Sequence, residues 1–140
     1  WTGLNGWVAD WTDGQFDSFS IQFILGTIFA PVAWILGVPS ADIMLVGQLL
    51  GEKTVLNEFY AYVSLTDMRD GEMFSSERSV VLATYMLCGF ANISSIGIQV
   101  GGIGVLAPSR RKELSELGVK ALIAGTMASL YTAAIIGLMI

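Results

Sequence analysis

The feature that most constrains this chain is an uninterrupted stretch of about 29 uncharged residues, 79–107. About 20 apolar residues suffice for a helix to cross the hydrocarbon core of a bilayer, so this stretch predicts a spanning helix. A second uncharged run closes the sequence and predicts a final spanning helix over 118–140. Charged residues make up only 14% of the chain, whereas a soluble domain carries about a quarter, so the composition also predicts a membrane protein.

Composition excludes several classes of function. The sequence has no histidine, which removes Ser-His and Cys-His nucleophiles and His-ligated zinc. Its net charge of -5 argues against a nucleic-acid partner. The single cysteine, Cys88, has no partner for an internal disulfide, and we expect it to be a small buried hydrophobic residue. We therefore expect no enzyme, no metal site and no cofactor.

Two polar residues and several glycines interrupt the long uncharged stretch. Asn92 and Ser95 are three positions apart, so we expect them to share one helix face. They could point at a ligand, or they could hydrogen-bond a neighbouring helix. The glycines around Gly101 weaken a helix and predict a break there, and broken helices are typical of transport sites.

The first forty residues divide into a turn-rich segment, expected outside the hydrocarbon, and an apolar segment that either spans with a kink or lies at the interface. Residues 1–17 are turn-rich, and Trp1, Trp7 and Trp11 suit the headgroup level, as does Trp34. Residues 18–40 carry no charge but contain two prolines, which predicts a kinked or interfacial helix. The sequence begins with Trp rather than Met and shows no basic leader, so we expect a piece of a longer chain without a signal peptide.

The region 41–65 places charges between two apolar pieces, with Glu52, Lys53 and Glu58 at its centre. Such charges are costly in a bilayer and are seldom present without a role. One interpretation is an amphipathic helix on the membrane surface with its charges facing water. The other is a re-entrant hairpin of two half-helices, whose polar turn lines a cavity at membrane depth. The spacing alone does not separate these two interpretations.

The two charged loops predict an orientation. The loop after residue 66 is mainly acidic, whereas the later loop carries Arg110, Arg111 and Lys112. The excess of basic residues in cytoplasmic loops places this later loop in the cytoplasm. The stretch 79–107 then runs inward and the last helix runs outward.

Three segments, in order, resemble the C-terminal part of the concentrative nucleoside transporter family, which comprises sodium- or proton-coupled nucleoside symporters. They are GEKTVLNEFYAY at 51–62, CGFANISSIGIQVGGIGVLAPSRR at 88–111 and LGVKALIAGTMAS at 117–129. The family pattern G-x-K-x-x-x-N-E-F-V-A is met except at Tyr60, where valine is usual. The resemblance implies an all-α membrane protein in which a re-entrant helical hairpin precedes a broken spanning helix and a final spanning helix. Together these would form one half of an inverted-repeat transporter core.

The resemblance also implies a nucleoside site near the membrane midplane. Its candidate residues in this chain are Glu58, Asn92, Ser95, Phe90, Asn57 and Lys53. Glu58 would accept hydrogen bonds from ribose hydroxyls, Asn92 and Ser95 would complete the ribose contacts, and Phe90 would border the base. Asn57 and Lys53 match the motif but have no assigned contact. A buried carboxylate suits this role because it is a strong acceptor whose desolvation is offset when hydroxyl donors arrive.

The implied function is ion-coupled nucleoside uptake by a multi-pass protein of the plasma (inner) membrane. The implied partners are the nucleoside, the lipid bilayer, the missing N-terminal part of the same transporter and further copies in a homotrimer. The coupling ion, sodium or a proton, would bind mainly outside this segment. Two alternatives stay open: a non-transporting membrane subunit whose intramembrane polar residues serve only helix packing, and a soluble-ligand-binding fragment.

Overall fold

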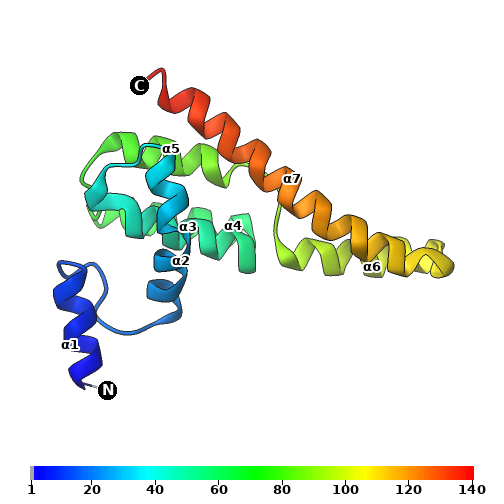
Figure 1. Ribbon diagram of the computed structural model, residues 1–140, viewed down its shortest axis with the longest axis horizontal. Coiled ribbons are helices and arrows are strands. Elements are labelled where there is room, and N and C mark those ends of the chain that lie inside the picture. Colours follow the sequence, from blue (N-terminus) through cyan, green and yellow to red (C-terminus); the bar gives the residue numbers. More distant parts are fainter. Residues whose placement is uncertain (1) are drawn as a thin grey trace.

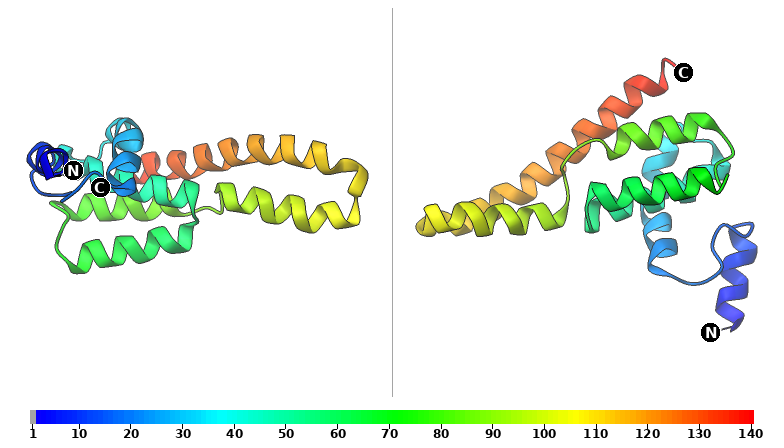
Figure 2. Two further views of the ribbon diagram at one scale, coloured as in Figure 1. Left: turned by 90° about the horizontal axis from the view of Figure 1, so that it is seen from below. Right: turned by 180° about the vertical axis from the view of Figure 1, so that it is seen from behind.

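The computed structural model describes residues 2–140, and this part of the chain consists of helices joined by short links (Figure 1). The elements are α1 (Thr2–Trp11), α2 (Ile21–Ile35), the 3-10 turn η1 (Ser40–Asp42), α3 (Ile43–Val55), α4 (Glu58–Asp70), α5 (Glu77–Leu87), α6 (Ile93–Leu106), the 3-10 turn η2 (Pro108–Arg110) and α7 (Arg111–Gly137). The pair formed by α6 and the first half of α7 projects away from the other helices (Figure 2). The all-α expectation is confirmed.

Helix α3 lies at the centre of the packed region, between α2, α4 and α5. Every residue from Leu45 to Lys53 is buried, and the core joins α3 to residues of α2, α4, α5 and α7. The contact with α2 is made backbone to backbone. A Cβ atom added at Gly47 would lie 2.5 Å from the carbonyl oxygen of Gly26, so a side chain at position 47 would separate the two helices.

The first forty residues differ in part from the sequence-based expectation. Residues 2–11 form a helix rather than turns, because Trp7 stacks on Trp11 with ring centroids 5.8 Å apart while Val8 is buried. The expectation for Trp1 lies outside the described residues. Helix α2 continues through Pro31 and spans only 15 residues, too few to cross a bilayer core. It ends at Ile35, before Gly37. This end agrees with the expected bias against helix at Val38, the residue that precedes Pro39.

The region 41–65 forms two helices, α3 and α4, joined by Leu56 and Asn57 alone. The two helices pack against each other, and α4 continues five residues beyond the expected end. Glu52 and Lys53 are only 3% and 1% exposed, so their charges do not face water. The interpretation of this region as a surface amphipathic helix is therefore wrong for α3.

The long uncharged stretch is broken, but not near Gly101, which lies inside α6. The break runs from Cys88 to Asn92, between α5 and α6, and the two helices point in the same general direction on either side of it (Figure 2). Gly89 has a φ of 146°, a conformation that favours glycine. Cys88 is exposed in this link, so the expectation of a buried cysteine is wrong.

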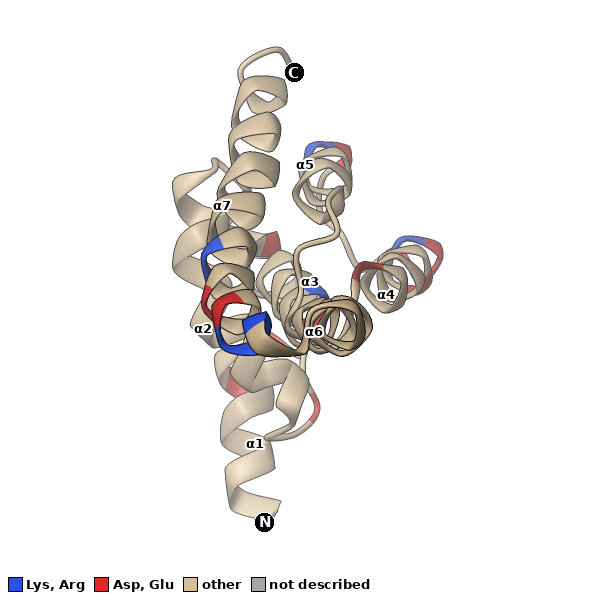
Figure 3. Cartoon of the chain, turned by 90° about the vertical axis from the view of Figure 1, so that its right-hand side faces the viewer, with Lys and Arg blue, Asp and Glu red and all other residues tan. Residues whose placement is uncertain are grey.

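Helix α7 begins at Arg111, earlier than the expected 118, so the basic run forms its first turn. Together with the preceding turn, over Pro108–Gly137, it is the one helix within residues 2–140 that is long and apolar enough to cross a membrane. Figure 3 shows that charged residues are absent from α2 and from most of α7. Large apolar side chains are exposed along α7, among them Ile123, Met127 and Tyr131.

Candidate functional site

The first turn of α4 follows the two-residue link and carries Glu58. Asn57 is the N-cap of α4, and its side-chain oxygen accepts a hydrogen bond from the backbone N–H of Tyr60 at 2.9 Å. Such a cap satisfies one of the free N–H groups at a helix start. Glu58 is half-buried, and its Oε2 atom is buried without a hydrogen-bond partner among the described residues. The candidate ribose acceptor therefore has a free, desolvated oxygen.

The first turn of α6 has a similar arrangement. Asn92 is the N-cap, and its Oδ1 atom accepts hydrogen bonds from both the backbone N–H and the hydroxyl of Ser95, each at 2.8 Å. Asn92 is 2% exposed, and its Nδ2 atom has no partner in the described part of the chain. The sequence-based prediction placed Asn92 and Ser95 on one helix face, whereas Asn92 actually precedes the helix and caps it.

The two helix starts lie next to each other (Figures 1 and 2). The Lys53 side chain, in the last turn of α3, reaches the backbone carbonyl of Met86, two residues before the break begins at Cys88. Tyr62, one turn beyond Glu58, donates its hydroxyl proton to the carbonyl of Thr84 on α5 at 2.9 Å. The fold thus brings residues from 53–62 together with residues from 84–95.

Lys53 is used by the protein itself. Its Nζ atom donates hydrogen bonds to the backbone carbonyl of Met86 at 2.9 Å and to the hydroxyl of Ser129 at 3.0 Å. These contacts join the end of α3 to the end of α5 and to the middle of α7. Sequence reasoning missed Ser129, although it ends the third segment of family resemblance and is a polar residue within an apolar helix.

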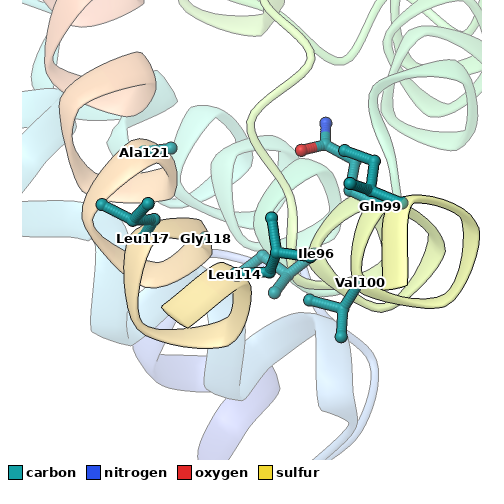
Figure 4. A pocket seen from close by; sticks show the side chains of 8 residues that line it. Ile96, Gln99, Val100, Leu114, Leu117, Gly118 and Ala121 are labelled. Carbon is teal, nitrogen blue, oxygen red and sulfur yellow. The ribbon is translucent and has the colours of Figure 1, made fainter. Parts of the chain in front are cut away.

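Phe90 lies in the break with its side chain 66% exposed. It lines a small cavity of about 60 Å³ together with Asn92, Ser95 and Gln99. A larger cavity of about 110 Å³ continues from it between α6 and α7 (Figure 4). That cavity is lined mainly by apolar side chains, and Gln99 is the one polar side chain among the residues that line it. The polar atoms that could recognise a ligand therefore gather at the Phe90 end.

Glu52 is the third residue with a buried polar atom that lacks a partner among the described residues. Its Oε1 atom accepts a hydrogen bond from Gln48 at 2.7 Å, whereas Oε2 has no partner among the described residues. Together with Tyr60 and three residues of α2, Glu52 lines a separate cavity of about 390 Å³. The one departure from the family pattern, Tyr60, thus faces α2.

A family model described as the Na+ dependent nucleoside transporter C-terminus matches residues 2–137. An uncharacterized transporter of Haemophilus influenzae is 40% identical over 99% of this chain and 33% of its own length. The putative nucleoside permease NupX of Escherichia coli is 39% identical over 89% of this chain and 30% of its own length. Sodium/nucleoside cotransporter 1 of Rattus norvegicus is 39% identical over 95% of this chain and 22% of its own length.

Solved structures agree with these sequence matches. The structure of CNTnw in an inward-facing substrate-bound state superposes with a TM-score of 0.79 at 37% identity, over 98% of this chain and 32% of that one. This chain therefore spans about a third or less of the length of these relatives. It belongs to the family of Na+-dependent nucleoside transporters, which are membrane transporters and not enzymes, and it corresponds to the C-terminal region of that family.

Proposed function

We propose that this chain supplies the ribose-contacting half of the nucleoside site in an ion-coupled nucleoside importer. The observation that carries the proposal is the pair of unpartnered polar atoms at two adjacent helix starts. Glu58 Oε2 is a hydrogen-bond acceptor and Asn92 Nδ2 is a donor, and both are buried. A ribose hydroxyl both donates and accepts, so the diol of one ribose can satisfy the two atoms together.

The energetics favour a ligand over empty space at these atoms. A buried polar group without a partner costs about 1–3 kcal/mol, and a charged one costs more. A hydrogen bond to a carboxylate is worth about 1.5–3 kcal/mol. Because the N-caps Asn57 and Asn92 already satisfy backbone N–H groups at both helix starts, Glu58 Oε2 and Asn92 Nδ2 are left for a ligand.

The other candidate residues take different parts in the proposal. Ser95 holds the Asn92 side chain through two hydrogen bonds and so fixes the direction of its free amide. Phe90 is exposed beside Asn92 in the shared cavity, where its ring can border the base. Asn57 caps α4 and orients the turn that carries Glu58. Lys53 has two protein partners, and we assign it no direct contact with the nucleoside.

We further propose that α3 and α4 form a re-entrant hairpin whose tip lies at membrane depth. Together with the broken helix of residues 79–107 and with α7, this hairpin would form one half of an inverted-repeat core in a multi-pass protein of the plasma membrane. The transporter would be a homotrimer, and its coupling ion would bind mainly outside this segment. The remaining parts of the transporter would cover the exposed apolar faces of α6 and α7. Ile98, Val105 and Leu106 on α6, at 70%, 69% and 86% exposed, support such a cover.

The second candidate function is a subunit in which these polar residues serve packing alone. Asp42 and Arg78 show that some polar residues here do have such a role, since their hydrogen bonds are made within the chain. Glu58 Oε2 and Asn92 Nδ2 differ because no group of the described chain reaches them.

Uptake of labelled uridine by the full-length parent in vesicles, with and without sodium, tests the proposal. We expect saturable uptake that other nucleosides compete with. A cysteine at Thr54, a half-buried residue in the last turn of α3, should react with a small hydrophilic reagent and be protected by uridine. Absence of saturable uptake of any nucleoside would leave the packing function ahead, and equal reactivity at position 54 with and without uridine would contradict the re-entrant hairpin.

A further inference from the structure

The break between α5 and α6 leaves backbone groups without their helical partners. In a continuous helix, the carbonyl of Met86 would accept a hydrogen bond from the N–H of Phe90, four residues later. The chain leaves α5 at Cys88, where ψ is 102°, and Phe90 makes no such bond in the described structure. A free carbonyl in a water-poor environment is costly, so a break of this kind needs a replacement donor.

Lys53 supplies that donor from another helix. Its Nζ atom bonds to the Met86 carbonyl at 2.9 Å while the side chain is 1% exposed. The last turn of α5 has no basic residue of its own, so the Lys53 ammonium also provides the positive charge that a helix C-terminus favours. The second bond, to the hydroxyl of Ser129 at 3.0 Å, ties the ammonium to α7 as well.

The break runs close to the Lys53 ammonium at Gly89. A Cβ atom added at Gly89 would lie 3.9 Å from Lys53 Nζ and 3.6 Å from Ser129 Cβ. The break therefore passes the Lys53 and Ser129 side chains with room for about one methyl group, while the φ of 146° at Gly89 favours glycine there. Lys53 and Ser129 thus lie beside the break, three residues before the Asn92 cap.

We propose that Lys53 is a positioning residue for the nucleoside site. It replaces the lost helical donor at Met86 and ties the break to α3, five residues before Glu58. Through this tie it sets the separation between the free acceptor of Glu58 and the free donor of Asn92. Ser129 has the same role more weakly, because it orients the ammonium and also donates its own proton to the Thr126 carbonyl. This inference rests on the proposed function, since it assumes that Glu58 and Asn92 bind one ribose.

The test compares two ligands in the purified full-length parent. Uridine can use both atoms of the site, whereas 2',3'-dideoxyuridine lacks the hydroxyls that would reach them. We expect Lys53→Met, which keeps most of the side chain's length and removes the ammonium, to weaken uridine binding about tenfold and dideoxyuridine binding less than about twofold. Ser129→Ala should weaken uridine binding about threefold, with the same preference for the ribose diol. Lys112→Met, at an exposed lysine in the first turn of α7, is the matched control and should change neither.

The ligand comparison separates positioning from a purely structural role. Unchanged uridine affinity in Lys53→Met, or equal losses for the two ligands, would overturn the inference. If Lys53→Met does not fold, Ser129→Ala decides by the same two criteria. Glu58→Gln is measured alongside: if it weakens uridine binding while Lys53→Met and Ser129→Ala do not, only the positioning role fails. If Glu58→Gln leaves uridine binding intact, the proposed function itself fails.

Discussion

Buried polar side chains near the two ends of α5 differ in how completely they are hydrogen-bonded. At its start, both carboxylate oxygens of Asp42 accept hydrogen bonds, Oδ1 from the backbone N–H of Ser75 at 2.8 Å and Oδ2 from the hydroxyl of Ser79. Arg78 donates to carbonyls at the ends of α2 and α7, including that of Gly137 at 2.7 Å. Beyond its end, Asn92 and the neighbouring Glu58 each keep one buried atom unpartnered within the described chain.

This difference separates polar groups that hold the fold from polar groups that can recognise a ligand. A fully partnered buried group contributes to stability and has nothing left to offer. A buried group with an unpartnered atom can still bind a ligand: Asn92 is held through its Oδ1 atom and keeps its Nδ2 atom available. The following variants should therefore divide into those that lower stability and those that lower affinity, all measured in the full-length parent.

The largest expected effect concerns the sides of the membrane on which the loop before α5 and the loop after α6 lie. Ser75, beside Asp42, should lie outside the cell and Ser109, before α7, should lie in the cytoplasm. Single cysteines at these positions, in a background with Cys88→Ala and no other cysteine, should label from opposite sides with an impermeant reagent. Labelling of both from the outside would contradict the orientation.

Asp42→Ala should destabilise the protein by about 3 kcal/mol, because it leaves a part-buried N–H and a buried hydroxyl without the carboxylate that accepts their hydrogen bonds. Uridine affinity per folded molecule should stay within about twofold, since the change lies at the start of α5. Thermal unfolding and equilibrium binding on the same preparation measure the two quantities. Asp67→Ala, at an exposed aspartate of α4, is the control and should change neither. A large loss of affinity in Asp42→Ala would erase the distinction between the two ends.

Asn92→Ser should show the opposite pattern. Serine is as good an N-cap as asparagine, so the start of α6 should keep its cap and the protein its stability. The free amide donor is lost, and uridine binding should weaken by about 1.5 kcal/mol. A variant that loses stability and keeps its affinity would assign Asn92 to packing.

Asn57 is expected to act only as a cap. Asn57→Ala should cost about 1 kcal/mol of stability, and Asn57→Ser should restore it. Neither variant should weaken uridine binding by more than about threefold. If Asn57→Ser restores stability while uridine affinity stays more than tenfold lower, Asn57 contacts the ligand.

The sequence predicted the broken stretch, the polar centre of 41–65 and the association of Asn92 with Ser95. It did not predict where the break falls. The density of glycines favoured a break near Gly101, yet α6 runs through this residue. A Cβ atom added at Gly101 would meet nothing within 4 Å, so no close neighbour requires a glycine there. The signal that marks the break is Asn92, a capping residue preceded by Gly89, and capping depends on φ and ψ angles that glycine counts do not reveal. Helix α1 was missed for a related reason, since stacking of Trp7 on Trp11 outweighs two glycines.

Lys53 illustrates what a single sequence leaves open. Its position in the motif indicated importance, but a lysine in an apolar segment could contact a ligand, a lipid headgroup or a distant carbonyl. Its actual partners, Met86 and Ser129, are 33 and 76 positions away and become neighbours only through the packing of α3, α5 and α7. Long-range pairings of this kind carry no local pattern.

The most direct test of the central claim measures Glu58→Gln against uridine and 2',3'-dideoxyuridine by equilibrium binding to the purified parent. Glutamine keeps the size of the side chain and removes the charge, so uridine binding should weaken by about 1.5–3 kcal/mol while thermal stability is retained. The dideoxy ligand has no ribose hydroxyls at these positions, so it should already have lost most of this binding energy. The loss caused by Glu58→Gln and the loss caused by removing the hydroxyls should therefore not add. Full additivity, or lower stability with uridine affinity within about twofold of the original, would show that Glu58 is not the ribose acceptor.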